Sequence, residues 1–381
     1  MKAHQSKIIG IDARLSGQEH AGIGRYIENL ILELLSHDQT NISWVLFFHH
    51  QKQARFLELL NVSNYKIVFA PIRHYSIQEQ LRWPRILKRE NLDLLHIPHF
   101  NIPLFYRSPF VITIHDLLWH QQIGPEVTTL PSWKYYLKYV AYRVITAQAV
   151  DRAKLIFVPT NSVKTDLLAY KPTLTNKIFV TPEGLSTAFE RENECLLTKK
   201  MIFENTKNKT LVYVGSLYPH KNIEVVFQAL CKLPQYQLKI VCSRNVFVER
   251  TKKRVNELQI THQVEFTGYL SDERLIETLQ NSLALIQPSK SEGFGLTAIE
   301  SMAVGTPVIA SSLPVFKEIY KDGPLFFDPN SSTNLVEQIL KLSTKSVYHH
   351  HQHLGLKIAQ QYRWLKTAAL TYNAYQDALK Q

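Results

Sequence analysis

The stretch Pro288-Ser289-Lys290-Ser291-Glu292-Gly293-Phe294-Gly295-Leu296-Thr297-Ala298-Ile299-Glu300-Ser301-Met302-Ala303 decides the fold that this sequence predicts. An apolar run of strand length, 283–287, precedes it. After it, Val304-Gly305-Thr306-Pro307 ends a helix, and a second strand follows at 308–310. The stretch is therefore a loop that passes directly into a buried helix inside a β–loop–α–β unit. In open α/β sheets such a loop lies at the carboxyl end of a parallel strand, where ligands bind.

The residue types in this loop suit a nucleotide-sugar. Its glycines let the backbone approach a ligand closely, and a helix start near Leu296 offers free N–H groups to a phosphate. Glu292 lies in the loop, and Glu300 lies about one turn into the helix. Two carboxylates would repel a bare phosphate, so they are better suited to sugar hydroxyls. The alternative is that one carboxylate caps a helix and the other is surface charge.

A glutamate, seven residues and a second glutamate around Gly-Phe-Gly-Leu resemble the donor-site motif of the retaining glycosyltransferases of family 4. The resemblance implies an α/β protein of GT-B architecture, in which two Rossmann-like domains with parallel sheets face each other across a cleft. In such a protein Glu292 would hold hydroxyls of the donor hexose and Glu300 the nucleotide ribose. The other donor-binding residues that the motif implies are Phe294, Gly295, Leu296 and Thr297.

Composition agrees with two domains and an anionic ligand. A chain of 381 residues is about twice the usual domain size. The net charge of +12 attracts nucleic acid, an anionic membrane or a nucleoside diphosphate without choosing among them. Three cysteines without metal-ligand spacing favour the reducing cytosol. The chain enters its first strand without an apolar signal segment, and no apolar run reaches about 18 residues.

The first half of the chain reads as one Rossmann-like domain. A strand at 7–11, a polar loop and a helix opened by Gly22-Ile23-Gly24-Arg25-Tyr26 begin it. Gly22 and Gly24 resemble the family's first loop, beneath the donor phosphates, although a turn without a ligand explains them too. Further strands are expected at 42–48, 65–69, 92–96, 110–114, 154–158 and 177–180.

Two strand ends in this domain carry polar residues. Asn101-Ile102-Pro103 follows two histidines after one strand, and either a role near the acceptor or ordinary loop packing accounts for it. His115-Asp116 follows the strand at 110–114 and matches the family pattern, in which this histidine contacts the donor sugar. Asp116 would orient the imidazole or cap the next turn.

The segment 130–143 is aromatic and basic. As a helix it could rest on an anionic membrane. Alternatively, its tyrosines and Leu137 pack inward while its lysines stay in water. Stacking on nucleic acid is the weaker interpretation, because helix packing explains the same residues.

We place the first, acceptor-side domain at 1–184 and the second, donor-binding domain at 185–362. A final helix at about 363–381 is expected to cross back to the first domain. Residues 186–208 are charged and poor in periodicity, which indicates a linker. The histidine-rich patch near 349–353 could bind a metal ion, but a solvated helical face is the preferred interpretation.

The second domain opens with a strand at 211–215 and a basic loop before a helix from about Ile223. Lys221 and that helix start predict a phosphate site. Family members often have an arginine beside this lysine or after the glycine. Here His220 and Ser216 occupy those places, so the second cation is missing or depends on pH. Gly215 belongs to the same loop, and Gly268-Tyr269 resembles the place where the nucleotide base rests.

The resemblance implies a hexosyltransferase that needs no cofactor and no bound metal. His115, Glu292 and Lys221 are its predicted catalytic residues, with Lys221 and the helix start near Leu296 stabilising the departing diphosphate. The Gly22–Tyr26 and Asn101–Pro103 segments look most like mannosyltransferases that use GDP-mannose to build bacterial surface polysaccharide such as lipopolysaccharide. The acceptor would be a glycan or lipid-linked. A UDP-linked glucose or N-acetylglucosamine donor stays open.

Two other classes of function are disfavoured. A non-catalytic basic protein that binds membrane or nucleic acid would gather its lysines and arginines on one face, whereas here they are dispersed. An NAD-dependent oxidoreductase would show a full GxGxxG after its first strand. We therefore expect a cytoplasmic enzyme, with possible peripheral contact to the inner membrane face and no nucleic-acid partner.

Overall fold

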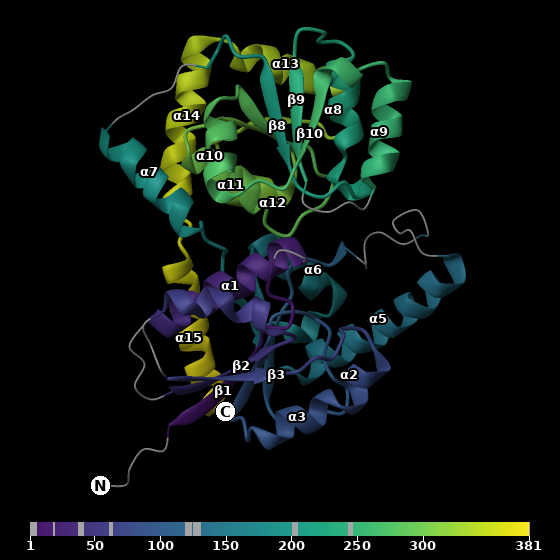
Figure 1. The fold of residues 1–381 in the computed structure, drawn as a ribbon, viewed down its shortest axis with the longest axis vertical. Coiled ribbons are helices and arrows are strands. Elements are labelled where there is room, and N and C mark those ends of the chain that lie inside the picture. The colour runs from purple at the N-terminus through teal and green to yellow at the C-terminus, as the bar shows by residue number, and fades with distance from the viewer. Residues whose placement is uncertain are drawn as a thin grey trace. The chain divides into compact units, whose positions relative to one another are not determined.

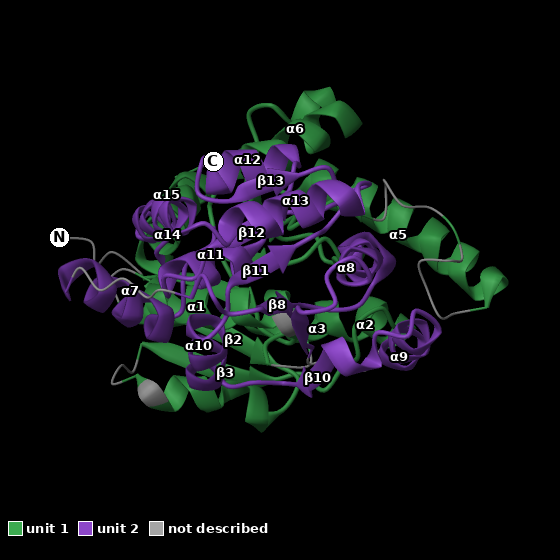
Figure 2. Cartoon of the chain, turned by 90° about the horizontal axis from the view of Figure 1, so that it is seen from above, with its two compact units in different colours: residues 1–182, 364–381 green, residues 183–363 purple. Residues whose placement is uncertain are grey.

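The computed structural model describes residues 6–17, 20–36, 42–60, 64–118, 124, 131–199, 205–242 and 247–380. The chain forms two compact units (Figure 1). Unit 1 comprises Met1–Pro182 and Trp364–Gln381, and unit 2 comprises Glu183–Arg363. Figure 2 colours the C-terminal helix with the first unit, although it follows the second in sequence.

Unit 1 is built on a seven-stranded parallel sheet with the order β3-β2-β1-β4-β5-β6-β7. Its central strands are buried along most of their length, as the apolar runs in the sequence predict. The strands are β1 Lys7–Asp12, β2 Ile42–Phe48, β3 Tyr65–Phe69, β4 Leu94–Ile97, β5 Phe110–Thr113, β6 Ile156–Val158 and β7 Ile178–Val180.

Helices cover this sheet, and α15 (Trp364–Lys380) lies beside α1 (Ala21–Ser36) (Figure 1). Trp364, Ala368 and Tyr375 of α15 pack into the same core as the apolar face of α1. Within the described residues of this unit, the remaining helices are η2 Gln51–Leu59, α2 Ile77–Leu81, α3 Trp83–Arg89, α5 Ser132–Arg152, α6 Asn161–Tyr170 and η4 Pro172–Leu174.

Unit 2 is built on a six-stranded parallel sheet with the order β10-β9-β8-β11-β12-β13. Its strands are β8 Thr210–Val214, β9 Gln237–Val241, β10 Val264–Gly268, β11 Ala284–Gln287, β12 Val308–Ser311 and β13 Leu325–Phe327. Its helices are α7 Thr187–Lys199, η5 Pro219–Lys221, α8 Ile223–Leu230, α9 Val248–Glu257, η6 Thr261–Gln263, α10 Asp272–Gln280, α11 Leu296–Ala303, α12 Pro314–Tyr320, α13 Ser332–Leu342 and α14 Lys345–Ala359. Two Rossmann-like parallel sheets confirm the predicted fold class.

The predicted linker at 186–208 is wrong over most of its length. Residues Thr187–Lys199 form α7, which packs its few inward side chains into unit 2. Phe189 and Leu196 are buried, and the Asn193 amide donates to the carbonyls of Ala303 and Leu356. Only these three positions face inward among charged neighbours, so the apolar stripe is too narrow to show a helical period. Residues 200–204 lie outside the described part of the chain.

Both sheets change strand order at one place. In unit 1 the chain turns between β1 and β4, and in unit 2 it turns between β8 and β11. Ligands of open α/β sheets bind beyond the carboxyl ends of the strands at such a switch point. The loop that precedes Lys221 follows β8, and the loop that holds Glu292 follows β11. The fold therefore brings the two predicted loops of unit 2 together at its switch point.

Candidate active site

Lys221 and Glu292 form a direct ion pair. The Lys221 Nζ lies 2.6 Å from the Glu292 Oε1, although 71 residues separate them in sequence. Their side chains are 21% and 11% exposed, so solvent or a ligand still reaches both. The sequence predicts each residue at the site; the structure adds that they contact each other.

Two further donors hold the Glu292 carboxylate. The Ser289 hydroxyl donates to its Oε1 at 2.8 Å, and the Gln287 amide donates to the same atom at 3.3 Å. Burial alone would raise the pKa of Glu292, but Lys221 and these hydrogen bonds outweigh it and hold that pKa below its usual range. Glu292 is therefore an anion at neutral pH, with its charge directed at the lysine.

The start of α11 is held rigidly next to this pair. Gly295 precedes the helix in the left-handed conformation, with φ of 89°. A Cβ there would overlap the Tyr320 hydroxyl, which donates to the Gly295 carbonyl at 2.6 Å. Thr297 in the first turn donates its hydroxyl to the Gln287 Oε1 at 3.1 Å, and Glu300 is buried one turn further on. The N–H groups of Leu296 and Thr297, three and four residues beyond Gly293, thus start this helix, and Gln287 links its first turn to the ion pair.

The loop after β8 carries Gly215, Ser216 and His220 as well as Lys221. Burial, reinforced by Lys221, lowers the pKa of His220 to about 4. The imidazole is therefore neutral at pH 7 in the unliganded protein, so Lys221 is the charged member of the His220-Lys221 pair. The His220 carbonyl accepts from the Lys290 N–H at 2.8 Å, which ties this loop to the one that follows β11.

Residues Gly268 and Tyr269 lie at the end of β10, on the edge of the same sheet. The sheet order separates β10 from β11 by β9 and β8. Tyr269 is 55% exposed. The predicted base-binding segment therefore lies, like Lys221, at the edge of the sheet formed by the carboxyl ends of the strands. It lies on the β9 side of β8, whereas Glu292 lies on the β11 side.

In unit 1, His115 follows β5 and is oriented by its neighbours. Its Nε2 lies 3.3 Å from the Pro98 carbonyl, which can only accept, so this nitrogen carries the proton. The Tyr26 ring packs edge-on against the imidazole at 4.7 Å between centroids. Asp116 accepts from the Leu118 N–H at 3.1 Å, which is the capping role among the two that the sequence allows.

Gly22 and Gly24, both in the first turn of α1, differ in what surrounds them. A Cβ at Gly24 would overlap the carbonyl of Gly17, so this glycine permits close packing of the helix on the preceding loop. A Cβ at Gly22 would meet nothing within 4 Å. Close packing therefore explains the glycine at position 24, whereas the space around Gly22 would accommodate a side chain.

Sequence reasoning missed a buried ion cluster in unit 1. The Arg14 guanidinium donates to the Asp12 carboxylate at 2.8 and 2.7 Å and to Glu79 Oε1 at 3.0 Å, and it stacks on Trp83 at 4.1 Å. All three charged side chains are at most 3% exposed. The one local signal is the capping pattern Ser76-Ile77-Gln78-Glu79, which predicts a helix start but not a buried carboxylate.

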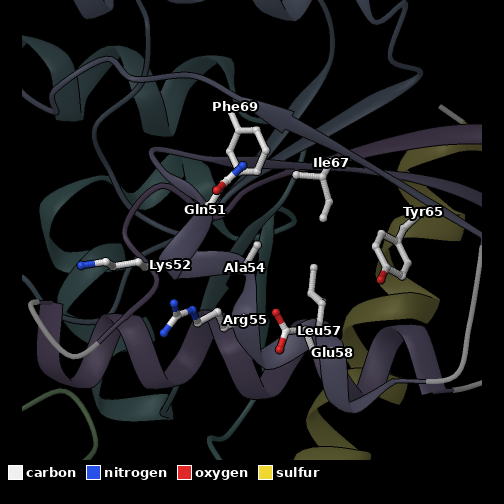
Figure 3. A pocket seen from close by; sticks show the side chains of 9 residues that line it. All are labelled: Gln51, Lys52, Ala54, Arg55, Leu57, Glu58, Tyr65, Ile67 and Phe69. Atoms are coloured by element: carbon white, nitrogen blue, oxygen red, sulfur yellow. The ribbon is translucent and has the colours of Figure 1, made fainter.

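An open hollow of about 530 Å³ lies elsewhere in unit 1, between η2 and the edge strand β3 (Figure 3). None of the predicted site residues lines it. Its walls are formed by Gln51, Lys52, Ala54, Arg55, Leu57, Glu58, Tyr65, Ile67 and Phe69.

Comparison with known proteins identifies the class. The chain is similar over 97% of its length to sucrose-phosphate synthase from Thermosynechococcus elongatus, with 98% of that chain covered, a TM-score of 0.73 and 16% identity. It is also similar to Anabaena HepE in complex with UDP and glucose, with 98% and 99% of the two chains covered, a TM-score of 0.69 and 16% identity. These likenesses show the GT-B fold.

Two family models then divide the chain between them. Residues 20–189 match Glycosyltransferase Family 4, and residues 198–357 match Glycosyl transferases group 1. The chain is 28% identical over 261 residues to the O-antigen chain mannosyltransferase RfbU of Salmonella typhimurium, covering 68% of this chain and 67% of that one. The chain belongs to the glycosyltransferases of family 4, and it is an enzyme of that class.

Proposed function

We propose that this chain is a retaining hexosyltransferase that moves mannose from GDP-mannose to a glycan or lipid-linked acceptor in surface polysaccharide synthesis. The observation that carries the proposal is the 2.6 Å contact between Lys221 and Glu292 at the switch point of unit 2. A cation suited to a diphosphate and a carboxylate suited to sugar hydroxyls are adjacent there, as the two halves of a nucleotide-sugar are.

The reaction requires stabilisation of the departing diphosphate. Lys221 and the N–H groups at the start of α11 would supply it, because both are fixed before the charge develops. Glu292 would then exchange part of its contact with Lys221 for hydroxyls of the hexose, and Glu300 would hold the ribose. His115 of unit 1 would contact the donor sugar. The proposed donor-binding set is completed by Gly22, Gly24, Gly215, Ser216, His220, Gly268, Tyr269, Phe294, Gly295, Leu296 and Thr297.

Unit 2 is thus proposed to bind the donor, and unit 1 the acceptor. The leaving phosphate would take the proton of the attacking hydroxyl, so no separate base is assigned. Such a front-face attack places the new bond on the face that the leaving group vacates, which retains the anomeric configuration. Exclusion of water would protect the donor from hydrolysis.

The choice of mannose is supported by the Salmonella relative, which is an O-antigen chain mannosyltransferase. UDP in the Anabaena complex supports the alternative, a UDP-linked glucose or N-acetylglucosamine donor. Incubation of the protein with GDP-mannose, UDP-glucose and UDP-N-acetylglucosamine distinguishes these possible donors. Release of GDP alone is the expected result, and release of no nucleotide in the presence of a glycan or lipid-linked acceptor pool would contradict the proposal.

A matched lysine variant tests the site assignment. Lys221→Ala should abolish most donor turnover. Lys232→Ala, the same change at an exposed lysine that contacts Ser332 and Thr333, should leave turnover unchanged. Full activity of Lys221→Ala would remove Lys221 from the site.

We further propose that unit 1 contacts the inner face of an anionic membrane through α5. Trp133, Leu137, Val140 and Val144 recur on one side of this helix and are 63%, 65%, 61% and 51% exposed, whereas Tyr135 and Tyr142 pack inward. Lys134 and Lys138 flank the apolar side chains, so the face combines apolar area with positive charge. Such contact would make the protein a cytoplasmic enzyme that associates peripherally with the membrane.

Among the described residues, no helix combines the length and apolarity that crossing a bilayer requires. Sedimentation with phosphatidylcholine vesicles, with and without phosphatidylglycerol, measures contact through α5. Leu137→Glu should reduce binding to the anionic vesicles. Leu340→Glu, at a leucine of unit 2 that is 48% exposed, serves as the control and should not. Equal binding by both variants would exclude α5 as the contact.

A further inference from the structure

Tyr75 has a backbone conformation that bulky residues rarely adopt. Its φ of 59° lies in the left-handed region, which glycine and asparagine adopt readily but tyrosine does not. The residue is nevertheless 60% exposed, so its ring is not held there by burial in the core. Strain of this kind persists only where the surroundings over-determine it, and it gathers at ligand sites.

The buried carboxylate of Glu79 imposes this conformation. Its Oε2 accepts from the Tyr75 N–H at 2.7 Å and from the Asn101 amide at 2.8 Å, while its Oε1 accepts from Arg14 at 3.0 Å. The Ser76 hydroxyl caps α2 by accepting from the Glu79 N–H at 3.2 Å. Arg14 and Asn101 thus hold Glu79, together with the His74 imidazole, whose Nδ1 lies 3.1 Å from the Glu79 Oε1. Glu79 in turn holds the peptide of Tyr75.

An aromatic shelf supports the exposed ring; we define it as Tyr75, His99, Phe100 and Tyr142. Tyr75 contacts the His99 ring edge-on, with 6.0 Å between centroids, and lies 6.3 Å from Phe100. Phe100 packs edge-on against Tyr142 of α5 at 4.8 Å. His99 and Tyr142 are buried and Phe100 is half-buried, so Tyr75 is the most exposed member of the shelf.

The shelf also leaves a hydrogen-bond donor for a ligand. The His99 Nδ1 accepts from the Asn101 N–H at 3.2 Å. Burial lowers the pKa of His99, so the imidazole is neutral and carries its proton on Nε2. That nitrogen lies 3.3 Å from the Tyr75 hydroxyl oxygen, and the Nδ1 lies 3.4 Å from it. The hydroxyl therefore accepts from Nε2 or donates to Nδ1, and a ligand oxygen can replace Nδ1 as the acceptor of its proton.

The position of the shelf connects it to the reaction. His99 follows β4, beside the switch point of unit 1, where ligands of such sheets bind. The neighbouring Pro98 carbonyl is the acceptor of the His115 Nε2–H. A ligand stacked on Tyr75 would consequently lie in the same loop cluster as the histidine that we assign to the donor sugar.

We propose that Tyr75, held by Glu79 and supported by the aromatic shelf, is a binding site for a sugar ring of the acceptor. An aromatic face matches the apolar face of a pyranose, and the tyrosine hydroxyl matches its ring substituents. The proposal rests on the proposed glycosyltransferase function and names the acceptor chemistry that unit 1 recognises, which is carbohydrate at this subsite.

The test uses the full-length protein and Tyr75→Asn. Asparagine tolerates the left-handed conformation, so this change removes the ring and the strain together. The thermal midpoint should stay the same or rise. Saturation-transfer NMR with the methyl glycosides of mannose, glucose, galactose and N-acetylglucosamine should show contact with the wild-type protein, and the signal should fall about five-fold or more in Tyr75→Asn. Tyr75→Phe should keep most of it.

Tyr136→Asn provides the control, because Tyr136 is 51% exposed in α5 and does not belong to the shelf. It should keep the full signal. Equal signals from wild type and Tyr75→Asn, no signal from any glycoside with wild type, or a lower thermal midpoint for Tyr75→Asn would each overturn the proposal. Donor turnover by the wild-type protein is measured separately, so failure of the proposed function and failure of this subsite are distinguishable.

Discussion

Each unit places carboxylates and a cation at the carboxyl ends of its parallel strands, yet the two ion clusters differ in what they leave accessible. Arg14 in unit 1 is fully buried between Asp12 and Glu79. Lys221 in unit 2 is 21% exposed and pairs with the one carboxylate of Glu292. The first cluster is closed to solvent, whereas the second retains access for an anion.

The difference indicates what each cluster does. A buried charge that meets all its partners within the protein fixes the surrounding backbone, since losing any partner leaves an uncompensated charge. A cation with one partner and some exposure can exchange that partner for a phosphate. We therefore propose that Arg14 supports the loops of unit 1 and that Lys221 takes part in the reaction. The following predictions separate stability from activity on this basis.

The largest expected effect is on the stability of unit 1. Arg14→Met would leave Asp12 and Glu79 buried without their cation and should lower the free energy of unfolding by about 3–5 kcal/mol. All five tryptophans of the sequence, at positions 44, 83, 119, 133 and 364, belong to unit 1, so tryptophan fluorescence in urea reports this unit. Lys221→Met, the matched change in unit 2, should leave that transition unchanged. Equal destabilisation of the tryptophan-reported transition by both would refute the distinction.

Next in size is an effect on turnover. Glu292→Gln keeps the shape of the side chain and its contact with Ser289 but removes the charge that faces Lys221. Loss of one preorganised electrostatic group commonly lowers kcat by about 10²–10³. We expect this loss for the preferred donor, measured as nucleotide diphosphate release, with the tryptophan-reported unfolding transition unchanged. Retention of wild-type kcat would show that the ion pair of unit 2 is as structural as that of unit 1.

How far the sequence alone predicts this molecule depends on whether the information is local. Apolar runs buried on both faces of a sheet place strands such as β2 and β11 within a residue of their predicted ends. The loops at Lys221 and Glu292 are equally visible, because glycines and helix starts are short-range signals.

Contacts between distant residues are not visible in this way. Arg14 and Glu79 are 65 residues apart, and no sequence pattern beside either residue predicts a buried partner. The strain at Tyr75 depends on that same carboxylate. The helix α7 is not predicted for another reason. Its inward face consists of only Phe189, Asn193 and Leu196, which is too few apolar positions to show a helical period.

A third effect concerns pH and unit 1. Burial, reinforced by His115, lowers the pKa of His96 to about 3 from its ordinary 6.5. The unfolded chain then binds the proton more strongly, so stability is fully present above about pH 6.5 and falls as pH decreases toward 3, by up to about 1.4 kcal/mol per pH unit.

Burial lowers the pKa of His99 as well, and this histidine contributes in the same direction. His96→Gln should accordingly remove about half of the pH dependence between about pH 6.5 and 4.5, measured as the shift of the tryptophan-reported urea midpoint. An unchanged slope would exclude His96 as a source of the acid sensitivity of unit 1.

The smallest effect compares two buried glutamines. Gln287 in unit 2 donates to Glu292 at 3.3 Å and accepts from Thr297 at 3.1 Å, so it orients the carboxylate and the first turn of α11 together. Gln53 in unit 1 instead donates to the Arg14 and Ser16 carbonyls, each at 2.9 Å. Methionine fills a similar volume in both places but offers no amide.

One net hydrogen bond corresponds to about 1 kcal/mol, or roughly a five-fold change in a rate or equilibrium constant. Gln287→Met should therefore lower kcat about five-fold with little change in the donor KM, whereas Gln53→Met should lower the stability of unit 1 and leave kcat unchanged. The reverse pattern would mean that the partly exposed ion pair of unit 2 needs no positioning residue and that the two units differ only in the burial of their ion clusters.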